Sequence, residues 1–210
     1  MLADTLKVIG DSKVIAIIRD IEKDKILDTV EALYDGGIRS IEVALNTDNA
    51  LKIIEMIKRE YKEKMVVGAG TVLDPESARL AILSGADFAL SPTLSLKVIE
   101  IFNRYDKLAI PGVFTPTEIL LAYEAGARVV KVFPIRSLGA GYIKDIKGPL
   151  NHVNIIPVGG ITVENAKEYI SSGAYAVGIG SNLVRKELIT ENKFDLLRQI
   201  TEKLICDLHS

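Results

Sequence analysis

The 210-residue sequence predicts an α/β fold in which eight parallel strands alternate with helices and close into a single barrel. Three observations lead to this prediction. Short apolar, β-branched runs recur roughly every 20 to 26 residues, as repeated strand–helix units do. Amphipathic stretches with a helical period lie between these runs. Glycines that can end a helix stand just before several of the runs.

The predicted strands are short segments rich in valine, isoleucine, leucine and alanine. They are Val14–Arg19, Ser40–Leu45, Met65–Ala69, Phe88–Leu90, Leu108–Pro111, Val129–Phe133, Asn154–Val158 and Ala176–Ile179. Eight such strands are the number that closes a parallel sheet into a barrel.

Glycine and proline mark the predicted helix ends. Glycine accepts the left-handed conformation that follows a last helical turn, and it stands in this place at Gly37, Gly85, Gly126 and Gly173. Helix starts are predicted at Thr115-Pro116-Thr117-Glu118, which has the pattern of a capping box, and at Asp74-Pro75. A short additional helix is expected around Ala3–Gly10.

No linker, low-complexity segment or charge block interrupts this rhythm. One (β/α)₈ barrel, the TIM-barrel architecture, is therefore expected to span residues 1–210 as a single domain. An open doubly wound sheet is the alternative architecture. Such a dinucleotide-binding fold would place glycines after the first strand, where this chain has Arg19-Asp20.

Composition favours a globular protein that acts on a small molecule. Hydrophobic residues make up 48% and charged residues 26%, and 26 Lys+Arg against 28 Asp+Glu leave a formal charge of -2. This balance gives no reason to expect nucleic acid or an anionic membrane as partner. No apolar run approaches the ~20 residues of a membrane span, and the amino terminus lacks the features of a signal peptide. With Cys206 as the only cysteine, a cytoplasmic location is expected.

Lys131 stands in the run Val129-Val130-Lys131-Val132-Phe133, which otherwise has the pattern of a fully buried strand. Charged side chains avoid such positions unless they are paired or functional. Burial lowers the pKa of a lysine and yields a nucleophilic amine, the group that forms Schiff bases with carbonyl compounds. A strand-end lysine that extends to solvent is the alternative, and this run alone does not decide between them.

Glu42 is expected on the inner face of the second strand. By the two-residue alternation of a strand, Ile41, Val43 and Leu45 share the face that meets the helices, which leaves Glu42 inside. A buried carboxylate is costly unless it acts or is paired, so an acid–base role and a structural ion pair with Lys131 are both open. Arg19 ends the first strand, where either a carboxylate-binding role or a solvated strand end fits.

Ligand-binding groups in such barrels gather at the carboxyl ends of the strands, and a phosphate site often follows strands seven and eight. The third strand ends in Gly68-Ala69-Gly70-Thr71, where small residues permit close approach of a ligand and Thr71 offers a hydroxyl. Glycine turns follow the seventh and eighth strands at Gly159-Gly160 and Gly180-Ser181. One turn alone is weak, but free N–H groups in both favour an anion cradle.

Metal and cofactor sites are not expected. Only His152 and His209 are present, far from any cluster of cysteines or carboxylates at metal-binding spacing. Neither a P-loop nor a Gly-x-Ser-x-Gly nucleophile elbow appears.

In these residues the sequence resembles the class I aldolases of the 2-keto-3-deoxy-6-phosphogluconate (KDPG) and 4-hydroxy-2-oxoglutarate (KHG) family, including the phosphogalactonate aldolases. The resemblance covers nearly the whole chain. It is carried in order by Val14–Arg19, Ile41–Val43, Gly68–Val72, Ser91-Pro92, Ile110–Gly112, Val130–Pro134, Lys147–Pro149 and Pro157–Gly160.

The resemblance implies a homotrimeric barrel enzyme without metal or other cofactor. Its expected substrate is KDPG or the galactonate epimer, which it would cleave to pyruvate and glyceraldehyde 3-phosphate; 4-hydroxy-2-oxoglutarate is a further expected substrate. Lys131 matches the Schiff-base lysine and Glu42 the general acid/base, while Arg19 and Thr71 match groups that hold the pyruvyl carboxylate end. The phosphate site is matched by Gly159, Gly160, Gly180 and Ser181.

Four positions bear on substrate specificity: Asn46, Pro92, Phe133 and Val158. Asn46 stands where many gluconate-type members carry an arginine that helps to hold the substrate carboxylate, and Arg19 looks like its replacement, as in phosphogalactonate-type members. Val158 stands where gluconate-type enzymes commonly carry threonine, near the hydroxyl that distinguishes the epimers. The sequence therefore leaves the preferred epimer open.

Two other classes of function remain open. An isomerase or epimerase of a sugar phosphate would share the phosphate site and use no imine, and a non-catalytic sugar-phosphate sensor would share it as well. The isomerase or epimerase class does not explain a lysine in the middle of a buried strand, and a Glu42 that faces Lys131 is an argument against the sensor.

Overall fold

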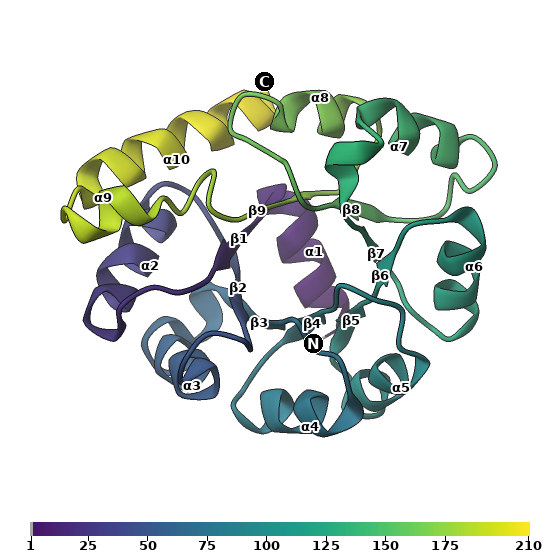
Figure 1. Cartoon of the computed structure of the whole chain (residues 1–210), viewed down its shortest axis with the longest axis horizontal. Helices are drawn as coiled ribbons and strands as arrows, with labels where there is room; N and C mark the ends of the chain where they lie inside the picture. Colours follow the sequence, from purple (N-terminus) through teal and green to yellow (C-terminus); the bar gives the residue numbers. More distant parts are fainter. Residues whose placement is uncertain (1) are drawn as a thin grey trace.

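The computed structural model describes residues 2–210, in which helices and short strands alternate around a central group of strands (Figure 1). The strands are β1 (Val14–Ile18), β2 (Ser40–Ala44), β3 (Val66–Gly70), β4 (Phe88–Leu90), β5 (Leu108–Ile110), β6 (Gly112–Val113), β7 (Val130–Val132), β8 (Ile155–Pro157) and β9 (Val177–Ile179). The α-helices are α1 (Leu2–Ser12), α2 (Ile26–Asp35), α3 (Ala50–Tyr61), α4 (Pro75–Leu83), α5 (Leu96–Arg104), α6 (Pro116–Glu124), α7 (Ala140–Lys147), α8 (Ala166–Ser171), α9 (Lys186–Thr190) and α10 (Phe194–His209). Short 3₁₀ helices lie at Lys23–Lys25, Lys62–Lys64 and Ile135–Ser137.

The strands form two sheets in which every pairing is parallel. A six-stranded sheet has the order β5-β4-β3-β2-β1-β9, and a three-stranded sheet has the order β6-β7-β8. This confirms the α/β class with parallel strands joined through helices. The strand order runs from β5 back to β1 and then to the last strand, without the reversal of a doubly wound sheet, so that alternative is wrong.

The expected fifth strand differs from its prediction, because the segment that follows α5 divides at Pro111. Residues before the proline pair with β4, and Gly112 and Val113 pair with β7 on the other side. Proline has no N–H to donate to a strand ladder, which interrupts the strand at this point. Its carbonyl still accepts a hydrogen bond from the Lys131 amide at 2.8 Å. The two sheets approach again where Val158 and Gly178 form an isolated parallel bridge.

Buried apolar side chains form two groups, as the alternation of the strands predicts. Residues such as Ile41 and Val43 belong to a large cluster between the strands and the helices. A smaller inner cluster lies on the opposite faces of the strands and is closed at one end by α1. Its buried members are Ile9, Ile15, Phe88, Leu90, Leu108, Ile110, Val129, Ile156, Val158 and Ala176.

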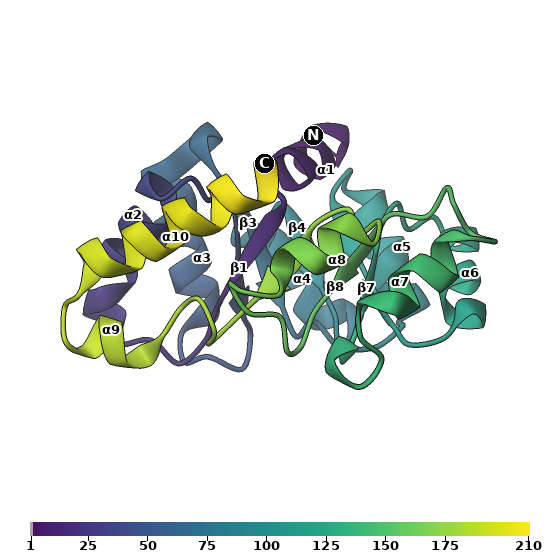
Figure 2. The same ribbon diagram turned by 90° about the horizontal axis from the view of Figure 1, so that it is seen from above.

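Helix α1 lies across the amino ends of the strands. Figure 2 shows it at one end of the strands, next to the carboxyl terminus of α10. Ile9 is fully buried in the inner cluster, and the Tyr175 hydroxyl, just before β9, donates to the carbonyl of Leu6 at 2.9 Å. The expected helix around Ala3–Gly10 is therefore present as Leu2–Ser12, and it closes the end of the strands opposite to the predicted site.

The helix boundaries predicted from local sequence are confirmed. Thr115 and Glu118 form a complete capping box at the start of α6, and the Asp74 side chain accepts from the Ser77 amide ahead of Pro75 in α4. Positive φ angles follow the helix ends at Gly37, Gly85, Gly126 and Gly173. None of the helices in residues 2–210 is both long and apolar enough to cross a membrane.

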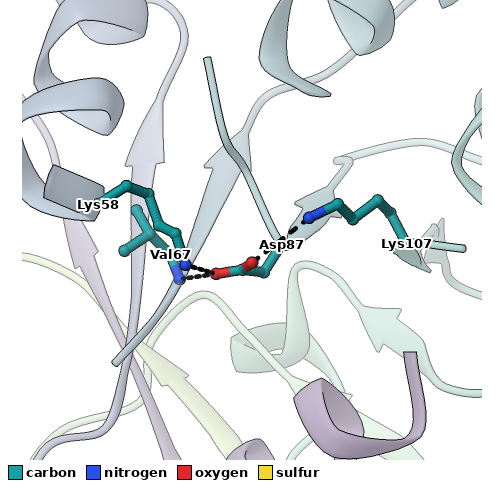
Figure 3. A network of polar contacts seen from close by, with 4 residues as sticks. All are labelled: Lys58, Val67, Asp87 and Lys107. Carbon is teal, nitrogen blue, oxygen red and sulfur yellow. Dashed lines mark hydrogen bonds and ion pairs between the residues drawn. The ribbon is translucent and has the colours of Figure 1, made fainter. Parts of the chain in front are cut away.

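Asp87 ties several elements together at the amino end of β4 (Figure 3). One carboxylate oxygen accepts from Lys58 Nζ of α3 at 2.7 Å and from the Val67 amide of β3 at 2.9 Å. The other oxygen lies 3.5 Å from Lys107 Nζ, just before β5. Because all three charged side chains are largely buried, this network should stabilise the fold more than a surface ion pair does.

Replacing Asp87 should therefore weaken the fold measurably. We expect Asp87→Asn to lower the free energy of unfolding by about 2 kcal/mol, because two largely buried ammonium groups lose the carboxylate with which they pair. Glu202→Gln is the matched control, since it breaks an exposed ion pair with Arg198, and it should cost less than about 0.5 kcal/mol. Urea unfolding of the three proteins measures the difference, and equal losses in the two variants would contradict the expectation.

Candidate active site

Glu42 lies on the inner face of β2, where it was predicted. The side chain is 2% exposed and pairs across the sheet with Ile17 and Gly68. Room for its carboxylate is made by Gly70: a Cβ atom at that position would lie 1.5 Å from Glu42 Oε1. Gly68 likewise makes room for the ring of Phe88, at 2.2 Å. These two glycines were interpreted as space for a ligand, and the structure shows instead that side chains of the protein occupy that space.

The Glu42 carboxylate is poorly solvated and incompletely bonded. Its Oε2 atom is buried and has no hydrogen-bond partner among the described residues. Burial raises the pKa of Glu42 to about 7, and the positive charges of Lys131 and Arg19 partly oppose this rise. A carboxyl group in this state can exchange a proton near neutral pH and has a free oxygen with which to do so.

Lys131 is buried in the middle of β7, so the alternative of a lysine that extends to solvent is wrong. The residue is 6% exposed and pairs with Gly112 and Ile156. Burial lowers the pKa of Lys131; Arg19 also lowers it, while Glu42 acts in the opposite direction. No ion pair among the described residues joins Lys131 to Glu42, so the structural ion pair considered from the sequence does not form.

The surroundings of the Lys131 amine are aromatic and tightly packed. Its Nζ atom lies 4.6 Å from the centroid of the Phe133 ring, a cation–π distance. The same ring packs against Gly159, where a Cβ atom would lie 3.1 Å from it. On the other side, the backbone of Pro92 lies against Gly112, the strand partner of Lys131, at 2.3 Å from where a Cβ would be. The Phe133 ring and the strand partner of Lys131 are thus both closely packed.

Thr71 follows β3, and Asn46 follows β2, the strand that carries Glu42. Thr71 is half-buried and has a φ of 58°, a left-handed conformation that is unfavourable for a β-branched residue. Strain of this kind is found preferentially at functional sites. Asn46, two residues beyond β2, is exposed to solvent.

A cavity of about 470 Å³ opens at the carboxyl ends of the strands. Its lining comes from the end of β1 and from the loops after β7, β8 and β9. The predicted site residues that line it are Arg19, Phe133, Val158, Gly159, Gly160, Gly180 and Ser181. Thr71, Asn46 and Pro92 do not line it, and neither do the buried Glu42 and Lys131.

The two glycine turns of this cavity present unused hydrogen-bond donors. Gly159 and Gly160 have φ values of 91° and 97°, and neither their amides nor that of Ser181 donates to an acceptor in residues 2–210. Asn182 joins the two turns, because its side-chain amide donates to the carbonyl of Ile161 at 2.8 Å. Such a group of free N–H donors is suited to bind an anion.

Four polar residues of the cavity were not predicted from the sequence: Asp20, Arg136, Asn182 and Lys186. Each follows a strand at its carboxyl end, the position where barrel enzymes carry functional groups, and this rule could have found them. They lie beyond the ends of the strands, however, where strand alternation no longer tells which side chains point inward. Histidine, cysteine, aspartate and glutamate form no group of three or more that could hold a metal ion within the described residues.

The sequence model of the KDPG and KHG aldolases matches residues 6–200. The chain belongs to this family. It is therefore an aldolase, a carbon–carbon lyase.

Individual relatives agree with this assignment. The 2-dehydro-3-deoxy-6-phosphogalactonate aldolase of Escherichia coli (strain K12) is 37% identical over 172 residues, which cover 81% of this chain and 84% of the relative. A solved structure described as native KDPGal has a TM-score of 0.87 at 32% identity and covers 93% of this chain and 94% of that one. KDPG aldolase from Legionella pneumophila, with pyruvate captured as a covalent carbinolamine, has a TM-score of 0.87 at 30% identity and covers 94% and 96%.

The burial of Glu42 in this family member has a consequence for stability. In the unfolded chain the carboxyl ionises near pH 4.5, whereas in the folded chain it holds its proton up to about pH 7. Because the folded state binds the proton more tightly, its stability falls as the pH rises through this window.

Glu42→Gln removes the ionisable group and therefore the loss of stability at higher pH. The variant should match the parent protein near pH 4 and exceed its free energy of unfolding at pH 8 by up to about 3 kcal/mol. Urea unfolding across this pH range measures the difference, with Glu55→Gln, on the exposed side of α3, as a control for loss of one carboxylate. A difference that does not change with pH would contradict the expected burial of the charge.

Proposed function

We propose that this aldolase cleaves KDPG or its galactonate epimer to pyruvate and glyceraldehyde 3-phosphate through an imine on Lys131. The observation that carries the proposal is the buried Lys131 amine, which has a lowered pKa and no carboxylate partner. A neutral amine of this kind attacks ketones. Relatives that are named for phosphogalactonate and for KDPG support the substrate class.

The reaction begins when the neutral amine of Lys131 attacks the C2 ketone. The carbinolamine loses water and leaves a protonated imine. Glu42 removes the proton of the C4 hydroxyl, the C3–C4 bond breaks, and its electron pair moves to the imine nitrogen to give an enamine. Glyceraldehyde 3-phosphate leaves, the enamine takes a proton at C3, and hydrolysis releases pyruvate and the amine. A pKa of about 7 suits Glu42 to accept and return protons here.

Arg19 and Thr71 are proposed to hold the carboxylate and carbonyl end of the substrate. Arg19 lines the cavity, and its positive charge lowers the pKa of both Lys131 and Glu42, which supports this role. The phosphate would lie at the other side of the cavity, where free amides are available. Its proposed ligands are Gly159, Gly160, Gly180 and Ser181.

Selection between the epimers is proposed to depend on side chains near C4. Phe133 and Val158 line the cavity, and Val158 also packs against Gly178, where a Cβ atom would lie 2.7 Å from its methyl group. Asn46 and Pro92 are assigned to the same task from the family resemblance, although both lie outside the cavity lining. Phe133 is the best supported, because its ring contacts both Lys131 and Gly159.

The two sheets are proposed to form one closed (β/α)₈ barrel, and residues 1–210 a single domain. The segment from Leu108 to Val113 pairs with β4 at its start and β7 at its end, and the bridge between Val158 and Gly178 joins the sheets on the other side. The inner apolar cluster draws residues from both sheets, as the filling of one barrel would.

Two other functions were considered, a sugar-phosphate isomerase or epimerase without imine chemistry and a non-catalytic sensor. Both would use the anion cradle but would have no use for a buried amine facing a protonatable carboxyl. Membership of the aldolase family does not favour either.

Trapping of the imine tests the proposed reaction. Borohydride reduction in the presence of pyruvate, followed by peptide mass spectrometry, should give a reduced pyruvate adduct on Lys131. Lys131→Arg should abolish the adduct, while Lys144→Arg, at an exposed position in α7, should leave it unchanged. Absence of an adduct from the parent protein would refute the imine mechanism.

A homotrimer is proposed, with α4 to α6 as the contact surface. Among the described residues, eight of the nine large exposed apolar side chains lie between Leu73 and Leu121, including Leu83, which is 64% exposed. Helices α4, α5 and α6 follow one another around one side of the molecule (Figure 1). A cavity of about 420 Å³ between α3 and α4 adjoins this surface and could receive a side chain. In a trimer of this kind, one part of the surface on each subunit would contact a different part on the next subunit. Such head-to-tail contacts close into a ring of three.

Light scattering after gel filtration tests this assembly. The parent protein should have three times the mass of its 22.9 kDa chain. Leu83→Glu and Leu120→Glu should reduce the mass to that of one chain, because a buried charge opposes association. Leu196→Glu, at an exposed leucine of α10, should leave the trimer intact. A parent protein with the mass of one chain would refute the proposal.

A further inference from the structure

The cavity at the carboxyl ends of the strands carries more positive charge than the family motifs explain. Arg19, Arg136 and Lys186 line it, and Asp20 is the only carboxylate among the lining residues, so the lining has a net charge of +2. None of the three cations forms an ion pair with a described residue. Arg19 is assigned above to the substrate carboxylate, which leaves Arg136 and Lys186 without a role.

Arg136 is fixed against the first glycine turn. Its amide donates to the carbonyl of Gly159 at 3.0 Å, and the preceding amide of Ile135 donates to Val158 at 2.9 Å. The side chain lies across Gly160: a Cβ atom there would be 2.6 Å from Arg136 Cβ and 3.6 Å from its Nε. Glycine at position 160 therefore provides the space that the arginine occupies. The Nε atom of its guanidinium lies beside the Gly159-Gly160 turn, whose amides are free.

Lys186 approaches the same cavity from the loop after β9. The amides of Leu183 and Val184 both donate to Gly180, which folds this loop back over its turn. Asn182 fixes the loop to the first turn through its bond to Ile161. The segments that carry Arg136 and Lys186 are thus both bonded to the turn after β8, and both side chains line the cavity that holds the free amides.

We propose that Arg136 and Lys186 form a cationic clamp that recognises the charge of the substrate phosphate and makes this aldolase select phosphorylated over unphosphorylated aldehydes and sugar acids. The inference rests on the proposed function and adds the substrate class that this site prefers. A phosphate monoester carries nearly two negative charges at neutral pH, whereas the corresponding hydroxyl carries none. Arginine pairs with phosphate through two parallel hydrogen bonds, and lysine adds a point charge.

Condensation with pyruvate supplies a matched pair of substrates: glyceraldehyde 3-phosphate and glyceraldehyde. Arg136→Gln and Lys186→Gln should each lower kcat/KM for the phosphorylated aldehyde about tenfold relative to glyceraldehyde, and the double variant should lower this ratio further. Arg136→Lys should restore part of the loss, since it keeps the charge without the fork of donors.

Two further variants test whether the charge of the cavity sets the preference for the phosphorylated aldehyde. Asp20→Asn removes the carboxylate that faces the same cavity, and asparagine tolerates the φ of 52° at this position, so the ratio should rise severalfold. Lys144→Gln removes an exposed cation of α7 that does not line the cavity, so the ratio should stay within twofold of the parent value.

The clamp is refuted if the double variant keeps the parent ratio, or if both aldehydes lose activity equally. Borohydride trapping with pyruvate is run on the parent protein and the double variant in parallel. An adduct on Lys131 in both, together with an unchanged ratio, rejects the clamp and leaves the aldolase mechanism standing. Absence of the adduct from the parent protein rejects the proposed function itself.

Discussion

The structure depends on two ionisable side chains, Lys131 and Glu42, that are buried inside the parallel strands without forming an ion pair with each other. Removing such groups from water costs several kcal/mol each, and a large apolar core has to offset that cost. Their surroundings are arranged to leave them reactive: Gly70 makes room for the carboxylate, and Phe133 covers the amine. The Glu42 carboxyl keeps one oxygen unbonded as a result.

The amino ends of the strands carry groups that stabilise the fold, and the carboxyl ends carry the groups of the candidate site. At the amino ends, α1 closes the inner cluster and Asp87 binds Lys58 and Lys107, so polar groups there satisfy one another. At the carboxyl ends, the amides of Gly159, Gly160 and Ser181 and the cations of the cavity find no partner within residues 2–210, and Thr71 is held in a strained conformation. Unsatisfied groups at this end are affordable because the opposite end and the core supply the stability.

Much of this arrangement could be predicted from the sequence, because strand alternation and helix capping are local rules. The inner position of Glu42 and the capping box at Thr115 follow from residues within a few positions, whereas the run around Lys131 left its burial open. The role of Gly70 could not be predicted, since its neighbour comes from another strand. Arg136 and Lys186 were missed because they lie in short helical segments beyond the strands, whose placement depends on tertiary hydrogen bonds such as that of Asn182. The division of the fifth strand at Pro111 was missed because it depends on which neighbouring strand each half meets.

The contact between Gly70 and Glu42 also limits how this chain can evolve. Any side chain at position 70 would occupy the space of the carboxylate, since even a Cβ atom would lie 1.5 Å from its oxygen. A side chain at position 70 is therefore acceptable only if the acid at position 42 becomes shorter or is lost. The glycine and the glutamate are thus sterically coupled, although they lie on different strands and only one of them carries a functional group. Among homologous chains, a glycine lost at this position should be accompanied by a shortened or absent acid at the other.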